Sequence, residues 1–257
     1  MTNRREHSLT GDCLLIHKRQ TTMKKLLTIV VLAITTCFAI SAKSTEPNSV
    51  IKYKADEILG ISQEAFNRPI LAHEYDQTTK EGVIIFKGAL TKITGEAFYS
   101  PAEWILFPES LVDISEYAFG FDGFCSEFRG KFAAENGCCL IVNGKLLQYS
   151  GERELENYTV PNGVTRICQG AFRYTAFGSI TIPQSVTEIH GSAFNGACKK
   201  LTMLSSKAPK IYGGELHDTE GTDRAVFTTK VYVPKGAAAN YKSAPYWKNV
   251  KEVIFEY

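Results

Sequence analysis

The sequence predicts a solenoid, a stack of short β-strands and tight turns, because one pattern recurs about every 22 residues. The fullest copy, from 177 to 194, reads FGSITIPQSVTEIHGSAF, and a second copy ends 22 residues earlier at Phe172. Two further copies end at Phe98 and Phe119 with the same internal spacing, except that Lys87 replaces the proline in the first. The shared positions are Ile180, Ile182, Pro183, Val186, Ile189, Ala193 and Phe194.

Each repeat unit predicts a strand followed by a turn. The side chains of residues 178–182 alternate between inward and outward positions and are rich in β-branched types, which is typical of a short strand with one buried face. Pro183 ends this strand because it has no N–H to donate. A second short segment and a helical or 3₁₀ turn follow. One unit cannot bury its own apolar face, but stacked units can, so we predict nearly complete burial of Phe98, Phe119, Phe172 and Phe194.

This pattern resembles the BspA-like leucine-rich repeat proteins of bacterial surfaces, whose consensus runs roughly Leu-x-x-Ile-x-Ile-Pro-x-x-Val-x-x-Ile-x-x-x-Ala-Phe. The copies ending at Phe119, Phe172 and Phe194 match it closely, and the resemblance covers roughly residues 55–257. It implies a strand-rich leucine-rich repeat solenoid of the α/β type. It also implies a secreted or surface protein, as some members are adhesins, and no shared catalytic residues.

The N-terminal residues predict a secretory signal. Residues 1–22 have no apolar period and precede a second methionine, so they are predicted to be a non-native upstream extension. From Met23, two lysines, an apolar run over 26–40 and a small-residue site ending at Ala42 form a signal peptide over 23–42. This stretch is too short and wrongly flanked for a membrane span. We therefore expect a mature chain that begins near Lys43, has no integral membrane span, and is secreted or held at the cell surface or envelope.

Processing also changes the charge. Without residues 1–42 the chain keeps 23 basic and 25 acidic residues, so its net charge changes from +2 to −2. Because the basic and acidic residues are nearly balanced, the net charge gives no reason to expect nucleic acid or an anionic membrane as partner.

Residues 43–82 are predicted to form an N-terminal cap, because their strand VIKYKADE is polar where later units are apolar. A degenerate echo of the repeat is predicted at Ile58, Ile61, Ala65 and Phe66. His73, Glu74 and Asp76 are placed on a polar loop. A solvated connector is favoured there over a metal site, since no matching ligand pair is present.

Residues 83–204 are assigned to the leucine-rich repeats, with an insert at 125–155 where the spacing between copies jumps to 53. Asn143-Gly144 between two apolar runs predicts a β-hairpin that extends the sheet. Five cysteines remain after processing, an odd number that argues against a full disulfide framework. Of Cys138 and Cys139, at most one could easily meet Cys125, because neighbouring strand residues face opposite ways.

Residues 205–257 predict a degenerate repeat and a closing segment. A strand-proline signature returns at 231–234, a short helix within 236–248 ends before Pro245 with Tyr241 and Trp247 as packing anchors, and Val253 with Phe255 supplies a last strand. The acidic loop before it could bind calcium but lacks the EF-hand spacing, so a solvated loop is favoured; its residues are Glu215, His217, Asp218, Glu220 and Asp223.

Neither catalysis nor a cofactor is expected. The sequence has no nucleophile elbow, phosphate loop, metalloprotease helix or Cys-x-x-Cys pair, so no catalytic or metal-ligating residues are assigned. A carbohydrate-active enzyme with two converging carboxylates stays as a minor alternative.

Binding is therefore the predicted function, and alternation along each strand identifies the outward residues. These are Val83 and Ile85, Trp104 and Leu106, Asn157 and Thr159, Ser179 and Thr181, Lys200 and Thr202, Lys230 and Tyr232, Glu252 and Ile254. The first two pairs are apolar: either the N-terminal cap covers them or they form an exposed patch.

The candidate binding residues are Trp104, Leu106, Asn157, Thr159, Ser179 and Thr181. We expect a non-catalytic binding module whose partner is a protein of a host matrix or another microbial surface, or a glycan. The alternative is a structural or assembly component of the cell envelope.

Overall fold

The computed structural model describes residues 47–257 with gaps at 121–122, 151–153, 174, 195–197 and 217–228. The chain divides into two compact units between Thr45 and Glu46, and the described residues belong to the second unit. The predicted upstream extension, the signal peptide from Met23 to Ala42 and residues 43–46 of the cap lie outside the described residues. So do the loop residues His217, Asp218, Glu220 and Asp223.

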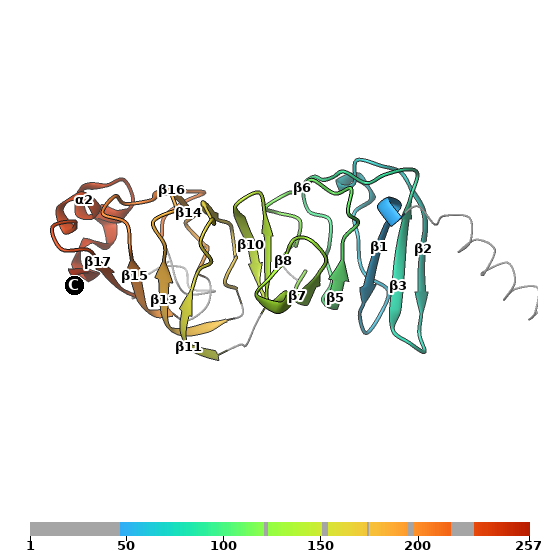
Figure 1. Ribbon diagram of the computed structural model, residues 1–257, viewed down its shortest axis with the longest axis horizontal. Coiled ribbons are helices and arrows are strands. Elements are labelled where there is room, and N and C mark those ends of the chain that lie inside the picture. The colour runs from blue at the N-terminus through green and yellow to red at the C-terminus, as the bar shows by residue number, and fades with distance from the viewer. Residues whose placement is uncertain (1–46, 121–122, 151–153, 174, 195–197, 217–228) are drawn as a thin grey trace, which may run out of the picture. The chain divides into compact units, whose positions relative to one another are not determined.

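The described residues form many short strands and few helical turns (Figure 1). The strands are β1 (Val50–Lys54), β2 (Ile70–Asp76), β3 (Glu81–Phe86), β4 (Lys92–Ile93), β5 (Ala102–Leu106), β6 (Asp113–Ile114), β7 (Cys125–Arg129), β8 (Ala133–Ala134), β9 (Cys139–Val142), β10 (Lys145–Tyr149), β11 (Glu154–Thr159), β12 (Arg166–Ile167), β13 (Ala176–Ile182), β14 (Glu188–His190), β15 (Cys198–Met203), β16 (Lys210–Tyr212), β17 (Lys230–Val233) and β18 (Ile254–Glu256). The helical segments are η1 (Pro47–Ser49), η2 (Gln63–Ala65), η3 (Glu135–Gly137), α2 (Ala238–Ser243) and η4 (Trp247–Val253).

The repeats build two layers of sheet, as a strand-rich solenoid requires. Each unit gives one strand to a wide sheet, in the orders β2-β3-β1-β5-β7 and β11-β13-β15-β17-β18. It gives a second strand, only two or three residues long, to a narrow sheet, in the orders β4-β6 and β16-β14-β12-β10-β9-β8, where the longer β9 and β10 belong to the insert. Successive repeat strands pair in parallel, so Ile180 lies beside Tyr158 on one side and Leu201 on the other. The predicted solenoid of about 22-residue repeats is confirmed.

The core lies between the two layers, at the positions that the repeat predicts. Equivalent residues of neighbouring units form columns, and the isoleucines of β12, β14 and β16 lie in register with Leu146 of β10. Phe98, Phe172 and Phe194 are at most 1 % exposed, which confirms the prediction for these three. It is wrong for Phe119, which is only half-buried because the insert replaces the repeat turn that would stack on it.

The N-terminal segment joins the wide sheet. β1 pairs antiparallel with both β3 and β5, so it lies between two repeat strands and does not fold over their outward face. The predicted repeat echo is wrong at Ile58, which is 49 % exposed, because Leu59, at 2 % exposed, takes the inward position; Ala65 and Phe66 are buried as predicted. His73, Glu74 and Asp76 lie on β2, and the loop predicted for them is wrong. The sequence did not indicate this strand because its residues are polar, which an edge strand tolerates. The Tyr53 hydroxyl contacts His73 Nε2 at 2.8 Å.

The insert contains the predicted hairpin. β9 and β10 pair antiparallel, and the turn residues Asn143 and Gly144 have φ values of 52° and 76°. Positive φ at both positions is the type I′ geometry that matches the twist of the strands. β10 then pairs in parallel with β12, so the hairpin extends the narrow sheet as predicted.

Cys125 is a buried thiol on β7, and we predict that its ionisation destabilises the fold at alkaline pH. Burial raises the pKa of Cys125 from about 9 to about 12. Between these two pKa values the folded state keeps a proton that the unfolded state loses. The contribution of the buried Cys125 thiol to the free energy of unfolding is therefore complete below pH 9 and is lost as pH rises toward 12. The stability difference between wild type and Cys125→Ala should shrink above pH 9, by up to about 1.4 kcal/mol per pH unit. Urea melts of both proteins between pH 8 and 11 measure it, and a constant difference would contradict the prediction.

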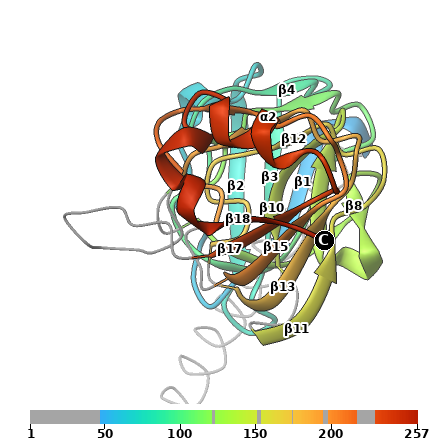
Figure 2. The same cartoon turned by 90° about the vertical axis from the view of Figure 1, so that its left-hand side faces the viewer.

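The C-terminal segment confirms the predicted helix and corrects the last strand (Figure 2). α2 ends before Pro245, and the side chains of Tyr241 and Trp247 are fully buried. Because η4 continues to Val253, the strand begins one residue later than predicted, and a shift of one residue exchanges the two faces. The outward assignment is therefore wrong for Ile254, which is 1 % exposed, and Phe255 faces outward at 43 % exposed. Glu252 is exposed, but it lies on η4 and not on the strand.

Candidate functional site

The outward face of the sheet β11-β13-β15-β17-β18 aligns equivalent side chains of successive repeats. Parallel pairing puts Asn157 beside Ser179 and Thr159 beside Thr181, so the structure brings these four predicted residues together on neighbouring strands. The rows continue across the sheet. One row is Asn157, Ser179, Lys200 and Lys230, and the other is Thr159, Thr181, Thr202, Tyr232 and Phe255.

Contacts between neighbours hold this outward face in place. The Ser179 hydroxyl donates to Asn157 Oδ1 at 2.6 Å. Lys200 Nζ lies 4.9 Å from the centre of the Tyr232 ring, and that ring lies 5.8 Å from the ring of Phe255. The face offers hydroxyl and amide groups at one edge and cationic and aromatic groups at the other. Such a surface suits a macromolecular partner, because a few residues supply most of the binding energy of an interface and aromatic side chains are enriched among them.

The other two predicted residues, Trp104 and Leu106, lie on β5 in the sheet β2-β3-β1-β5-β7. Trp104 is 8 % exposed, and the Arg129 guanidinium lies 4.2 Å from the centre of its ring. Arg129 is exposed and donates to Glu127 Oε1 at 2.6 Å, which lowers the pKa of the Glu127 carboxyl. Leu106 is half-buried beside Lys52 of β1 and Arg129 of β7. Binding by Trp104 and Leu106 stays a prediction.

Sequence reasoning missed two features of the surface. The outward position of Phe255 was missed because β18 begins one residue later than predicted. The alternation of the closing Ile-Phe-Glu-Tyr could have indicated it. The second feature is a pocket of about 170 Å³, which no sequence motif indicated because it is formed by residues from three separate repeats and from the insert.

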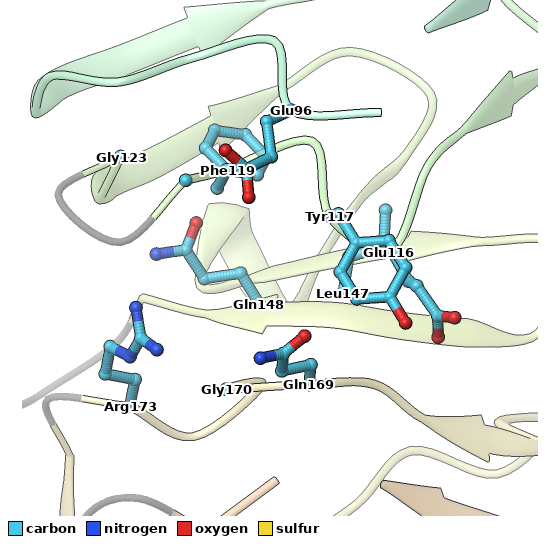
Figure 3. A pocket seen from close by; sticks show the side chains of 11 residues that line it. Glu96, Glu116, Tyr117, Phe119, Gly123, Leu147, Gln148, Gln169, Gly170 and Arg173 are labelled. Carbon is cyan, nitrogen blue, oxygen red and sulfur yellow. The ribbon is translucent and has the colours of Figure 1, made fainter. Parts of the chain in front are cut away.

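The pocket lies where the insert interrupts the ladder of repeat turns (Figure 3). In the other repeats that the structure describes, neighbouring Ala-Phe turns pack on one another, as in the pair Phe172 and Phe194, whose rings are 5.5 Å apart. Beside Phe119 the next level belongs to β10, which continues as a strand to Tyr149 and makes no such turn. Leu147 and Gln148 of β10 therefore lie at the floor, between the turn that contains Phe119 and the turn that contains Gly170.

Polar side chains gather around this pocket. Glu96, Glu116 and Tyr117 lie on one side, and Gln169 and Arg173 lie on the other (Figure 3). A hydrogen bond from outside the pocket fixes the carboxylate of Glu116, whose Oε2 accepts from the Tyr212 hydroxyl at 2.8 Å. Burial and then the Glu116 carboxylate raise the pKa of the Tyr117 hydroxyl, which therefore stays protonated at neutral pH.

Gln148 is the unusual member of the lining. Its side chain is 7 % exposed, and its Oε1 accepts no hydrogen bond from any residue that the structure describes. Buried polar atoms almost always have a partner, so this oxygen requires an explanation. A buried carbonyl oxygen facing a pocket is a ready acceptor for a ligand that donates a hydrogen bond.

The described residues do not point to metal chemistry or to a membrane span. Within residues 47–257, leaving out the gaps, no group of three or more His, Cys, Asp and Glu side chains could hold a metal ion. Among the same residues, none of the helices has the length and apolar character needed to traverse a bilayer.

Comparison with known proteins identifies the repeat. The model of the BspA type leucine-rich repeat region matches residues 70–127 and 147–212, with six copies. The residues between these two stretches belong to the insert, which explains the interruption. No curated protein matches the chain.

Proposed function

We propose that this chain, which carries leucine-rich repeats of the BspA type, is a non-catalytic protein-binding module. Its partner would contact the outward face of β11, β13, β15, β17 and β18. A repeat fold of this kind is typically a binding scaffold, since stacking offers an extended surface while the core needs only the inward residues.

The observation that carries the proposal is the row from Thr159 to Phe255. It crosses five neighbouring strands and ends on an aromatic side chain that is 43 % exposed. Tyr232 and Phe255 would act as anchors, and Lys200 beside Tyr232 adds a charge that favours an acidic partner surface. Asn157, Thr159, Ser179 and Thr181 would supply adaptable hydrogen bonds.

Trp104 and Leu106 would form a second contact region on the other wide sheet. Because the Arg129 guanidinium lies over the Trp104 ring, a partner would meet the arginine first and the ring edge second. The chain would act as a secreted or surface protein after cleavage of residues 23–42, on a host matrix or a neighbouring microbe. A structural role in the cell envelope is the alternative.

Photo-crosslinking from matched positions tests this proposal. A photoreactive amino acid replaces Thr159 on the outward face or Thr187, which precedes β14 on the narrow sheet; both threonines are exposed. Each variant is mixed with extracellular matrix proteins and with surface proteins of neighbouring microbes. We expect a discrete crosslinked protein from position 159 and none from position 187, and a probe at Leu106 tests the second region.

Equal crosslinking from positions 159 and 187, or none from 159, would contradict recognition through this face. A module that is built into the envelope would instead crosslink to copies of itself or to envelope components of its own cell. That pattern would favour the structural alternative.

A further inference from the structure

We propose that the pocket above Gln148 binds one neutral sugar ring, such as the terminal monosaccharide of a glycan. The site is separate from the outward strand face, since its lining comes from the repeat turns and from β10. The inference therefore does not depend on the proposed function.

The buried oxygen of Gln148 defines the first requirement on the ligand. Oε1 accepts no hydrogen bond within the described part of the chain, and the side chain faces the pocket from its floor (Figure 3). Leaving a buried acceptor unpaired costs stability, whereas pairing it with a ligand donor recovers that cost. The ligand must therefore carry an O–H or N–H group.

The other polar groups favour a neutral ligand with several hydroxyls. Glu96 and Glu116 supply acceptors, whereas the Arg173 guanidinium supplies donors on the opposite side of the pocket. The two carboxylates outnumber the one guanidinium, so an anionic ligand is disfavoured. A cationic ammonium or guanidinium group carries donors only, so it could pair with the carboxylates but not with Arg173. A sugar hydroxyl both donates and accepts, so one ring can satisfy both sides without net charge.

Size and shape select a single ring. An apolar cavity of about 150 Å³ holds a benzene molecule, and the pocket measures about 170 Å³. The side chains of Phe119 and Tyr117 stand at its sides (Figure 3). The negative face of an aromatic ring attracts the weakly positive C–H groups that a sugar presents on one side.

The test uses the full chain and simple probes. Glucose, galactose, mannose, N-acetylglucosamine and fucose are each added at about 10 mM, which is ten times a dissociation constant of about 1 mM. Saturation-transfer NMR detects contact between sugar and protein, and calorimetric titration gives the affinity. N-acetylarginine methylamide serves as the cationic comparison.

Gln148→Leu removes the buried oxygen and leaves an apolar side chain of comparable size. We expect sugar affinity to fall at least tenfold and the melting temperature to stay equal or rise, because an unpaired buried acceptor has been removed. An ordinary structural glutamine would give no such combination. Gln63→Leu, an exposed glutamine on η2, is the matched control and should change neither quantity.

Tyr117→Ala provides a second variant, because this side chain is 43 % exposed and its loss leaves the core intact. It should also weaken sugar binding, whereas replacing Thr159 on the strand face should not. The proposal is overturned if no sugar binds, if arginine binds in place of sugars, or if the Gln148 and Tyr117 variants bind sugar as wild type does. Failure of these tests would leave the crosslinking result at Thr159 unaffected.

Discussion

Replacing Phe172 with alanine is expected to lower the free energy of unfolding by about 3–5 kcal/mol. The side chain is 1 % exposed, and its ring lies 5.5 Å from that of Phe194 and 5.4 Å from that of Phe177. Two more rings, of Tyr149 and Tyr158, lie within 6.2 Å. The truncation removes contacts to two neighbouring repeats at once, and close-packed neighbours cannot fill the cavity fully.

Thermal and urea melts measure this loss, which should lower the melting midpoint by roughly 6–20 °C for a chain of this size. Phe119→Ala is the matched control, because the same repeat position is only half-buried there. Its effect should be clearly smaller, since its ring already borders the pocket. Equal losses for the two variants would contradict the burial difference between these positions.

Replacing Trp247 with alanine is expected to cost a similar 3–5 kcal/mol. The indole is fully buried, lies 5.2 Å from the Tyr241 ring, and donates from Nε1 to the Pro209 carbonyl oxygen at 2.7 Å. The substitution leaves that carbonyl without its donor as well as leaving a cavity. Because α2 and η4 pack against each other around this side chain, the last repeat should open first.

Hydrogen exchange resolves where that opening occurs. Amide protection should fall in β17 and β18 while the amides of β5 and β7 keep theirs, because contacts in a solenoid are made between neighbours. Lys248→Ala, at the next and exposed position, is the control and should change neither stability nor exchange. Uniform loss of protection over the whole chain would show that the closing segment is not a local cap.

Several parts of the fold could be predicted from local chemistry. The alternation and proline of residues 178–183 were sufficient to place β13, since a strand of this kind depends on its own side chains and on identical neighbours. Asn143-Gly144 defined the hairpin because few other residues adopt positive φ at both turn positions. Ile58 and Ile254 were misplaced because the pattern is degenerate at both ends of the array, where one residue decides the face.

The candidate sites were less accessible to sequence reasoning. Alternation put Asn157, Thr159, Ser179 and Thr181 on one outward face, and the strand register agrees. It could not show that Arg129, from the next strand, lies over Trp104. Nor could it show that β1, an antiparallel strand, separates β3 from β5.

The sequence by itself determined the repeat, its period and its inward columns, because these depend on spacing that every unit restates. Only the tertiary structure decided what happens where the period breaks. There β10 continues as a strand in place of an Ala-Phe turn, so that Gln148 is buried at the floor of a pocket between Phe119 and Arg173. The reason is physical: a regular unit packs against copies of itself, whereas an insert packs against whatever surfaces its two neighbours leave.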